Sequence, residues 1–429
     1  MTGFLEPSNR GLNGDANLDL LLEQVNYSYS NSPFFKNLRR SFNGRKAAID
    51  SLELFKQLPT VSKDDLNRAN ESFVVKKGGR IVEYVTTSGS LGTPLSIGLT
   101  RNDLERLAYN EKMALGISGL KPDHSVLITT TLDKRFMAGM AYYLGAVSIG
   151  ATVIRNGIGS LHFLLENLRN YQPEVLIGVP SLLVKLIDFA RENEIDLNQL
   201  PLSKAICIGE PLRTSDLKPN NLANRINRHW DIELFSTYAS SEMMTSFAEC
   251  DQHHGGHLIP ELIWIELLDE EGNEVLPGYP GELTITPLGV EGTPLVRFRT
   301  GDIVRMHTNK CSCGRDTLRL GPVEGRKSQQ IKLKGTTLFP TQIENILHQS
   351  EFVDDFIIEI SKSEMDTDVV RIYMPNSLNT SETKTIAELL EAGLRVSPVI
   401  EKVPKSVLHE MVFPKGGRKP IRIKDRRYE

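Results

Sequence analysis

Between residues 123 and 240 the sequence alternates short apolar runs with longer amphipathic ones, and this alternation constrains the fold more than any other feature. The short runs include HSVLITTTL, ATVIRNG and PEVLIGVP, and the longer ones are FMAGMAYYLGAVSIG, SLHFLLENLRNYQ and SLLVKLIDFARENEI. Strands that alternate with helices of about 10–15 residues are typical of βαβ units in a parallel sheet. We therefore predict an α/β fold, in which KAICIGEPL and DIELFSTYASSE supply further strands.

The segments on either side of this region have different patterns. Residues 1–80 are polar and mostly helical in pattern, with LDLLLEQVNYSYS and SKDDLNRAN as helix-like pieces. After residue 258, short strand-like runs with the turn signals EEGN and PGYPG predict antiparallel β structure. The linker-like EGRKSQQ precedes a final unit with α+β character. We predict a large N-terminal domain, residues 1–326, with parallel α/β sheets plus β structure, and a small α+β domain, residues 327–429.

Charge and composition exclude several classes of protein. The 50 basic and 54 acidic residues give a net charge of −4, which argues against a nucleic-acid partner. No run reaches the roughly 18 apolar residues of a membrane span, and the first residues, MTGFLEPSNRGLNGD, lack the pattern of a signal peptide. Four cysteines in 429 residues do not form a disulfide scaffold. We expect a soluble cytoplasmic protein that binds neither membrane nor nucleic acid.

Three polar loops follow predicted strands, where α/β sheets bind their ligands. These loops are TTSGSLGTP (86–94), GEP (209–211) and STYASSE (236–242). Glycines let backbone N–H groups approach phosphate oxygens, and hydroxyls add donors, so the first loop suits a phosphate. It lacks the spacing of a Walker loop, and a plain surface turn is the alternative reading.

Besides the first loop, four pieces suit a nucleotide, although each alone is also compatible with a surface feature. In FRTGD, Asp302 offers a bidentate acceptor for ribose hydroxyls. In TYASSE, Glu242 offers a carboxylate for a magnesium ion. GRKSQQIKLKG (325–335) lies at the expected domain boundary, and GGRKPIRIKDRR (416–427) is a basic segment that carries glycines.

Taken in this order, the motifs resemble those of adenylate-forming enzymes, a family that includes acyl-CoA synthetases and luciferases. The correspondence runs through TSGSLGTP (87–94), YASSE (238–242) and FRTGD (298–302). The run CSCGRDTLRLGPVEGRKSQQIKLKGTTLFPTQIENIL and the ending KPIRIKDRR are most similar to the phenylacetate–CoA ligase branch. The resemblance covers residues from about 80 to 429.

The resemblance implies a role for individual residues. Lys419 would be the catalytic lysine of a mobile C-terminal domain, Glu242 would hold Mg²⁺, Gly335 would line a CoA tunnel, and Ser328 would be the hinge. The ATP- and AMP-binding residues would be Ser88, Gly89, Ser90, Gly92, Gly209, Glu210, Pro211, Tyr238, Ala239, Ser241, Asp302 and Arg326.

The chain departs from the family pattern at three of its motifs. Thr93 replaces the lysine of the phosphate loop, so one charge partner of the phosphates is missing. Ala239 replaces a glycine, which is a small change, and Ser328 replaces the usual hinge aspartate. A small polar residue can still absorb a backbone rotation.

Three cysteines and one histidine suggest a metal site. Cys250 and His257 flank the turn HHGGH, and Cys311 and Cys313 form a C-x-C motif. Three thiolates and one imidazole complete a tetrahedral Zn²⁺ site of the structural kind, and some members of the branch have such a site. His253 and His254 are rival ligands, and free thiols are the alternative. Cys207, in an apolar strand, is expected to be a buried structural thiol.

The implied activity is an ATP-dependent acid–thiol ligation. A carboxylic acid, aryl or arylacetic by resemblance, would form an acyl-AMP with release of pyrophosphate, and CoA would accept the acyl group. The segment LDKRFMAGM lacks the Tyr-Gly-Tyr-Gly run of phenylacetate–CoA ligases and places Lys134 and Arg135 near the expected pocket, although a solvated role suits both. The alternatives are an acyl carrier protein as acceptor and a non-catalytic nucleotide-binding homologue. Many members of the branch are dimers, so a homodimer is also considered.

Overall fold

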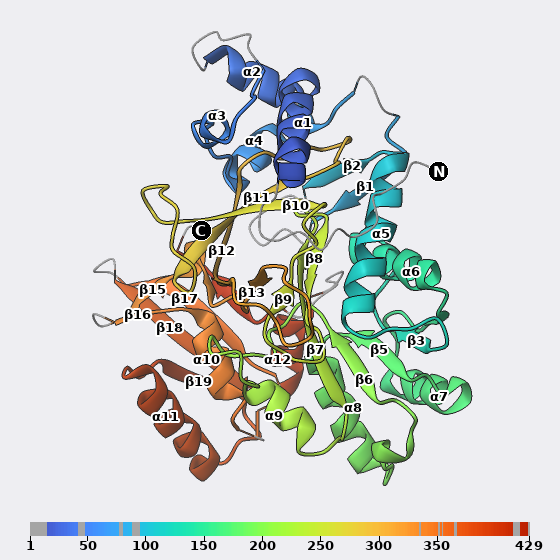
Figure 1. The fold of residues 1–429 in the computed structure, drawn as a ribbon. Helices are drawn as coiled ribbons and strands as arrows, with labels where there is room; N and C mark the ends of the chain where they lie inside the picture. The colour runs from blue at the N-terminus through green and yellow to red at the C-terminus, as the bar shows by residue number, and fades with distance from the viewer. Residues whose placement is uncertain are drawn as a thin grey trace.

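The computed structural model describes residues 15–41, 48–76, 80–87, 95–333, 336–350, 352–353, 355–363, 367–414 and 421–427 (Figure 1). Within them, a 12-stranded sheet runs through the large N-terminal part of the chain. One half of this sheet is parallel and has the strand order β7-β6-β5-β3-β4. Its strands are β3 (Ser125–Ile128), β4 (Thr152–Arg155), β5 (Val175–Gly178), β6 (Lys204–Cys207) and β7 (Glu233–Ser240). The predicted α/β character is confirmed.

Helices cover both faces of the parallel half. Val126 and Ile128 pack with one set of helices, whereas Leu127 packs with the other, because successive side chains of a strand point to opposite faces. Burial on both faces explains why β3, β5 and β6 read as continuous apolar runs, whereas the edge strand β4 is partly exposed. The first set is α5 (Arg101–Ile117) and α6 (Met137–Ile149), and the second is α7 (Leu161–Tyr171), α8 (Pro180–Glu192) and α9 (Asn221–Asn227).

The other half of the sheet is antiparallel, as the turn signals predicted. It contains β8 (Thr245–Ala248), β9 (Gly256–His257), β10 (Ile263–Leu268), β11 (Pro280–Pro287), β12 (Phe298–His307), β13 (Arg319–Leu320) and β14 (Gly325–Arg326). Side chains of the N-terminal helices, such as Phe35 and Phe55, share a core with Trp264 and Ile285 of this half. These helices are α1 (Asp15–Asn31), α2 (Pro33–Ser41), α3 (Leu52–Lys56) and α4 (Lys63–Phe73).

One prediction about the phosphate loop was wrong. The strand before it, β1 (Glu83–Thr86), does not belong to the parallel sheet but pairs antiparallel with β2 (Ser96–Leu99) in a sheet of two strands. The cause is the length of the connection, because a parallel crossover needs a dozen or more residues and the loop between β1 and β2 is shorter.

A separate, smaller sheet forms the C-terminal unit. Its strand order is β19-β18-β17-β20, and Phe356, Ile358 and Ile372 lie in its apolar core. The elements after β14 are the 3-10 turn η2 (Lys327–Gln329), β15 (Ile331–Leu333), β16 (Thr336–Leu338), α10 (Pro340–Leu347), β17 (Ile357–Lys362), β18 (Asp368–Pro375), α11 (Thr380–Leu394), β19 (Val399–Val403), α12 (Lys405–Val412) and β20 (Ile423–Asp425). The expected small α+β unit is therefore present.

The smaller unit contacts helices α8 and α9 of the larger one. The Asn221 backbone N–H donates to Asn345 Oδ1 at 3.2 Å, and the Asn221 amide donates to the Asn345 carbonyl at 2.8 Å. Arg225 Nη1 donates to the Val353 carbonyl at 3.0 Å. On helix α8, Lys185 forms an ion pair with Asp355 at 3.5 Å. Polar contacts of this kind are typical of interfaces between domains that can move.

Helix α5 carries a buried glutamate, Glu111, against strand β8. Its carboxylate accepts hydrogen bonds from Ser246 Oγ at 2.6 Å and from Asn110 Nδ2 at 3.0 Å. Burial raises the pKa of Glu111 to about 7, although these two hydrogen bonds oppose the rise. The folded protein therefore retains a proton on Glu111 at pH values where the unfolded chain has released it.

We expect Glu111 to contribute a fall in stability as the pH rises from about 4.5 to 7, and Glu111→Gln to remove this contribution. Relative to the variant, the wild type should lose on the order of 3 kcal/mol of unfolding free energy across that window. Urea unfolding at pH 5 and pH 8 measures the difference. Glu105→Gln, on an exposed part of the same helix, is the matched control. A parallel pH dependence in the wild type and Glu111→Gln would contradict the expectation.

Candidate nucleotide and metal sites

Three of the predicted site residues converge at Asp302. Tyr238, on β7, donates its hydroxyl to Asp302 Oδ2 at 2.7 Å, and Arg326, on β14, donates Nε to Oδ1 at 3.0 Å. Burial, followed by the charge of Asp302, raises the pKa of Tyr238 well above its usual value, so its hydroxyl remains a donor. The carboxylate is mostly buried, and each of its oxygens retains acceptor capacity for a further donor.

The sequence folds this way because Asp302 and Arg326 face each other across paired strands. Strand β12 pairs with β14 in a register that sets Asp302 opposite Arg326. Gly301 precedes the aspartate with a φ of +79°, a conformation that glycine adopts without strain. The Asp302 backbone N–H also donates to Thr300 Oγ1 at 3.1 Å, which fixes the local turn.

The turn between β7 and β8 carries Ser241 and Glu242. It is closed by hydrogen bonds from the backbone N–H groups of Met243 and Met244 to Ser240 Oγ and O, both at 3.2 Å. Among the described residues, the Glu242 carboxylate has no hydrogen bond or ion pair, so its oxygens are available to a cation. Ala239, one residue before the turn, is exposed at the end of β7.

The GEP loop follows strand β6. Gly209 has a φ of +75°, which lets the chain reverse after the strand. Glu210 Oε2 accepts the backbone N–H of Ser181 at 2.8 Å, so this side chain caps the start of helix α8. The Pro211 carbonyl accepts from Asn220 Nδ2 at 2.7 Å. The loop therefore has a defined shape, with the Glu210 side chain already engaged by the protein.

Several predicted residues lie outside the described part of the chain: Ser88, Gly89, Ser90 and Gly92 of the phosphate loop, Gly335 and Lys419. The two ends of the phosphate loop are joined by a hydrogen bond from the Thr87 N–H to the Leu95 carbonyl at 3.0 Å. The Thr86 N–H donates to the Arg135 carbonyl at 2.9 Å, which places the exposed segment with Lys134 beside the end of strand β1.

The expected hinge residue, Ser328, lies in the 3-10 turn η2 between the two sheets. Its carbonyl accepts a hydrogen bond from Arg427 Nη2 at 2.9 Å, and Arg427 also donates to the Gln330 carbonyl at 2.6 Å. A side chain near the end of the chain therefore holds the connection between the two units.

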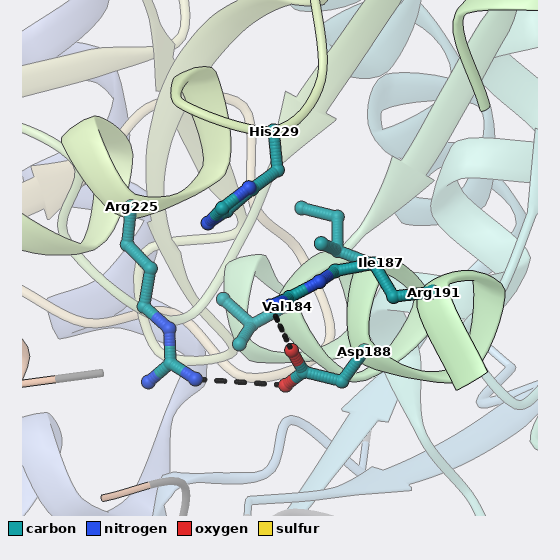
Figure 2. Close-up of a pocket in the computed structure, with 6 residues that line it drawn as sticks. All are labelled: Val184, Ile187, Asp188, Arg191, Arg225 and His229. Atoms are coloured by element: carbon teal, nitrogen blue, oxygen red, sulfur yellow. Dashed lines mark ion pairs between the residues drawn. The ribbon is translucent and has the colours of Figure 1, made fainter. Parts of the chain in front are cut away.

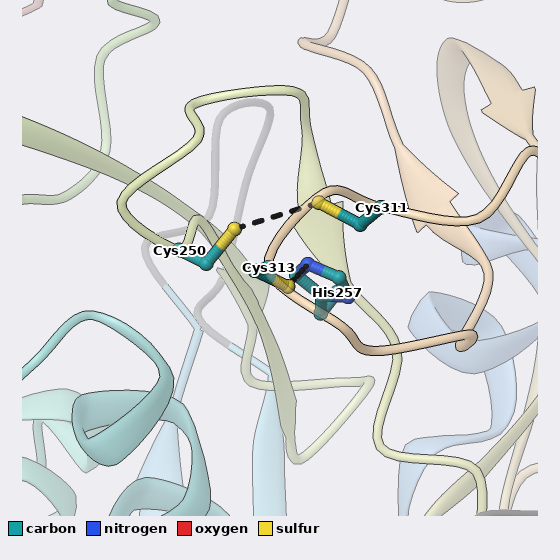
Figure 3. Close-up of side chains that lie close together, drawn as sticks. All are labelled: Cys250, His257, Cys311 and Cys313. Atoms are coloured by element: carbon teal, nitrogen blue, oxygen red, sulfur yellow. Dashed lines mark hydrogen bonds between the residues drawn. The ribbon is translucent and has the colours of Figure 1, made fainter.

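Cys250, His257, Cys311 and Cys313 form a cluster beside strands β8, β9 and β13 of the large sheet (Figure 3). Their ligand atoms all lie within 4.8 Å of one another. Cys250 Sγ is 3.8 Å from Cys311 Sγ, and Cys313 Sγ is 3.5 Å from His257 Nε2. Strands β9 and β13 bring the two halves together, because His257 pairs with Arg319 across them. This donor set, three sulfurs and one imidazole, suits Zn²⁺.

The surroundings of the cluster favour the metal-binding forms of His257 and Cys313, whereas burial raises the pKa of the Cys250 thiol to about 12. Burial, then Arg315 and Arg319, lower the pKa of His257 to about 4, so its ring is neutral near pH 7. Thr317 Oγ1 lies 2.9 Å from His257 Nδ1, which leaves Nε2 facing the thiols. Although burial opposes it, hydrogen bonds from Arg315 lower the pKa of Cys313. Thr317 was not anticipated, and its place shortly after the C-x-C motif is the only signal for it.

The rival histidines have other contacts. His253 lies 3.4 Å from carboxylate oxygens of both Glu233 and Glu249, and its ring packs against Phe235. The carbonyl of His254 accepts a hydrogen bond from Arg319. Cys207 is fully buried in strand β6, as expected of a structural thiol. The geometry therefore groups His257, and neither His253 nor His254, with the three cysteines.

A small cavity between helices α8 and α9 is a different feature (Figure 2). Asp188 in its wall forms ion pairs with Arg225 at 3.5 Å and Arg191 at 3.9 Å. Its volume of about 20 Å³ is far below that of a metabolite pocket.

Among the helices in the described part of the chain, none is long and apolar enough to cross a membrane.

The chain is similar to known enzymes of one family, both in its match to a family model and in its curated relatives. The model of the AMP-binding enzyme family matches residues 35–290. Four curated phenylacetate–coenzyme A ligases are 25–28% identical to the chain. The one from Thermus thermophilus is 27% identical over 329 residues, which are 75% of this chain and 72% of that protein.

Solved structures of 2-hydroxyisobutyryl-CoA ligase have the same fold. Its postadenylation state, in complex with 2-HIB-AMP, has a TM-score of 0.83 at 22% identity and covers 98% of this chain and 92% of that one. Its thioesterification state, in complex with 2-HIB-AMP and CoA, has a TM-score of 0.69 at 20% identity, with 99% and 96% covered. The two-unit architecture described above is therefore that of adenylate-forming ligases.

Proposed function

The chain belongs to the AMP-binding enzyme family, and from this premise we propose that it is an ATP-dependent acid–CoA ligase. It activates a carboxylic acid as acyl-AMP, releases pyrophosphate and transfers the acyl group to the thiol of CoA. The observation that carries the proposal is the convergence of Tyr238 and Arg326 on Asp302, beside a turn whose Glu242 carboxylate is unpaired among the described residues.

The proposed ATP site follows from this arrangement. Asp302 accepts hydrogen bonds from the ribose hydroxyls, and Tyr238 and the GEP loop of Gly209, Glu210 and Pro211 surround the adenine. Ser241 contacts the α-phosphate, and Ala239 belongs to the same nucleotide-binding motif. Ser88, Gly89, Ser90 and Gly92 bind the pyrophosphate portion, and Arg326 lies near the ribose or phosphates. The phosphate loop has no lysine, since residue 93 is threonine, so its contribution comes from N–H and hydroxyl donors.

Acid activation concentrates negative charge on phosphoryl oxygens in the transition state. Fixed cations and N–H donors stabilise this charge most effectively because they need no reorganisation. We assign this role to Lys419 and to the donors of the phosphate loop. Glu242 is the residue that would hold Mg²⁺, which supplies positive charge to the phosphates when bound.

The two reactions require two arrangements of the protein. We propose domains 1–326 and 327–429, with the rotation at Ser328, so that the small domain presents Lys419 for adenylation and Gly335 for the CoA tunnel. The polar contacts between Asn221 and Asn345 suit an interface that opens.

We further propose that the Cys250, His257, Cys311 and Cys313 cluster holds a structural Zn²⁺. All four ligand positions are filled by protein, so the site has no open position for chemistry. A closed site of this kind would join the segment after β8 to the loop between β12 and β13.

The relatives suggest the identity of the substrates. Because the curated relatives are phenylacetate–coenzyme A ligases, we propose an aryl or arylacetic acid as substrate. The exposed Lys134 and Arg135 instead favour a more polar acid or an acyl carrier protein as acceptor. A cytoplasmic location and a homodimer complete the proposal.

The test is carboxylate-dependent exchange of labelled pyrophosphate into ATP, with a panel of aryl and short acyl acids. We expect one class of acid to support exchange and a Lys419→Ala control to lower it. CoA and a carrier protein are then compared as acceptors. Measurable ATP binding without exchange for any acid would favour a non-catalytic nucleotide-binding protein.

A further inference from the structure

Helix α5 presents a buried polar stripe to strand β8. Arg106 and Asn110 have no exposed surface, and Glu111 is 4% exposed. A helix normally buries apolar side chains, because a buried polar group is costly unless it is hydrogen-bonded. A buried polar stripe of this kind therefore implies that its hydrogen bonds fix the position of the segments packed against the helix.

Arg106 forms four hydrogen bonds, and two of them reach the last residue of the turn that carries Glu242 and the first residue of β8. Nη1 donates to the Met244 carbonyl at 2.5 Å, and Nη2 donates to Thr245 Oγ1 at 3.0 Å. The other two bonds go to carbonyls of neighbouring segments, from Nε to Leu288 at 2.6 Å and from Nη2 to Leu262 at 2.5 Å. The planar guanidinium thus ties the turn to two other parts of the sheet, which a lysine ammonium cannot do with the same geometry.

The turn needs such a restraint because its last residue is in an unfavourable conformation. Met244 has a φ of +49°, in the left-handed region that residues with a side chain rarely adopt. The carbonyl that Arg106 holds belongs to this same residue. The following strand is fixed by the rest of the stripe, since the Ser246 N–H donates to Asn110 Oδ1 at 3.0 Å and its hydroxyl donates to Glu111.

We propose that Arg106 is a positioning residue for the metal-dependent part of ATP binding. It holds the β7–β8 turn in its left-handed conformation at Met244, and so sets the direction in which Glu242 meets a magnesium ion on the phosphates. Arg106 itself contacts neither nucleotide nor metal. The inference rests on the proposed function, which assigns Mg²⁺ to Glu242.

The test compares Arg106→Lys with Arg297→Lys. Arg297 is the matched control, because it is also buried and donates to the carbonyls of Lys56 and Leu58 at 2.6 and 2.5 Å, away from the turn. Calorimetry gives the Mg²⁺ dependence of ATP binding and, without Mg²⁺, the affinity for AMP. We expect Arg106→Lys to raise the half-saturating Mg²⁺ concentration at least fivefold and to leave the AMP affinity within twofold. Arg297→Lys should lower the melting temperature without the Mg²⁺ shift.

Equal Mg²⁺ dependence in wild type and Arg106→Lys would overturn the proposal, as would the same shift in Arg297→Lys. If Arg106→Lys does not fold, Thr245→Val replaces it, because it removes the hydroxyl that accepts from Arg106 Nη2. Ser118→Ala is its control, since Ser118 is buried and donates to the Glu249 carbonyl at 3.0 Å. A Mg²⁺ shift of at least threefold in Thr245→Val alone supports the proposal, and its absence refutes it. Wild-type protein without affinity for ATP would instead count against the proposed function.

Discussion

Asp302→Asn should lower kcat/KM for acyl-adenylate formation at least about a hundredfold and weaken AMP binding in proportion. The carboxylate accepts from Tyr238 and Arg326 and, in the proposed complex, from the ribose. Asparagine keeps one acceptor oxygen and turns the other position into a donor, which then faces either the Tyr238 hydroxyl or Arg326 Nε. Losing two hydrogen bonds to a charged acceptor costs about 3–6 kcal/mol, which corresponds to roughly a hundredfold or more.

Two variants distinguish this loss of nucleotide binding from a loss of folding. Tyr238→Phe removes only one donor to Asp302, which costs about 1.5–3 kcal/mol, so we expect a loss of roughly tenfold to a hundredfold, smaller than that of Asp302→Asn. Asp269→Asn alters an aspartate that closes the turn between β10 and β11 through Asn273, and it should leave AMP binding unchanged. Pyrophosphate exchange and calorimetry with AMP provide the measurements. An Asp302→Asn protein that binds AMP within twofold of the wild type would contradict the ribose assignment.

The α/β fold could be predicted because local patterns in the sequence match the final packing. Val126, Leu127 and Ile128 are all buried, since helices cover both faces of the sheet, and a continuous apolar run is the pattern of such a strand. The order of the strands is not a local property. Strand β1 therefore looked like a member of the parallel sheet, although its short connection to β2 forces an antiparallel pair.

Helix α5 was not anticipated because its buried face is partly polar. Arg106, Asn110 and Glu111 interrupt the apolar spacing by which an amphipathic helix is recognised. A signal for its start does exist in the sequence, since Thr100 and Asp103 form a capping box. The stripe satisfies hydrogen bonds to segments far along the chain, such as Leu288, and those partners can be identified only in three dimensions.

The candidate sites were predicted as residue types rather than as geometry. Asp302 and Arg326 were both expected near a nucleotide, but their ion pair depends on the register of β12 and β14. The choice of His257 over His253 depends on where the chain turns. The His253 ring contacts the carboxylates of Glu233 and Glu249, and no pattern in the sequence predicts either contact.

The second large effect is expected from a substitution in the metal cluster, which consists of Cys250, His257, Cys311 and Cys313. Cys311→Ser should abolish stoichiometric zinc binding and lower the melting temperature by about 5–10 °C. Binding of a structural metal contributes its free energy directly to folding. This site would join two segments that are far apart in the sequence but adjacent in the structure. Metal analysis of the purified protein and differential scanning calorimetry test the expectation. Cys207→Ala is the matched control, because Cys207 is a buried thiol outside the cluster.

Loss of the metal should also weaken nucleotide binding, although less than tenfold. Glu249, which precedes Cys250, accepts from Arg213 Nη2 at 3.0 Å and from the Ser236 N–H at 3.0 Å. Arg213 follows the GEP loop, so a displaced Cys250 segment would disturb the proposed adenine site through these bonds. If Cys311→Ser and the chelated wild type keep both their melting temperature and their AMP affinity, the four residues do not form a structural metal site.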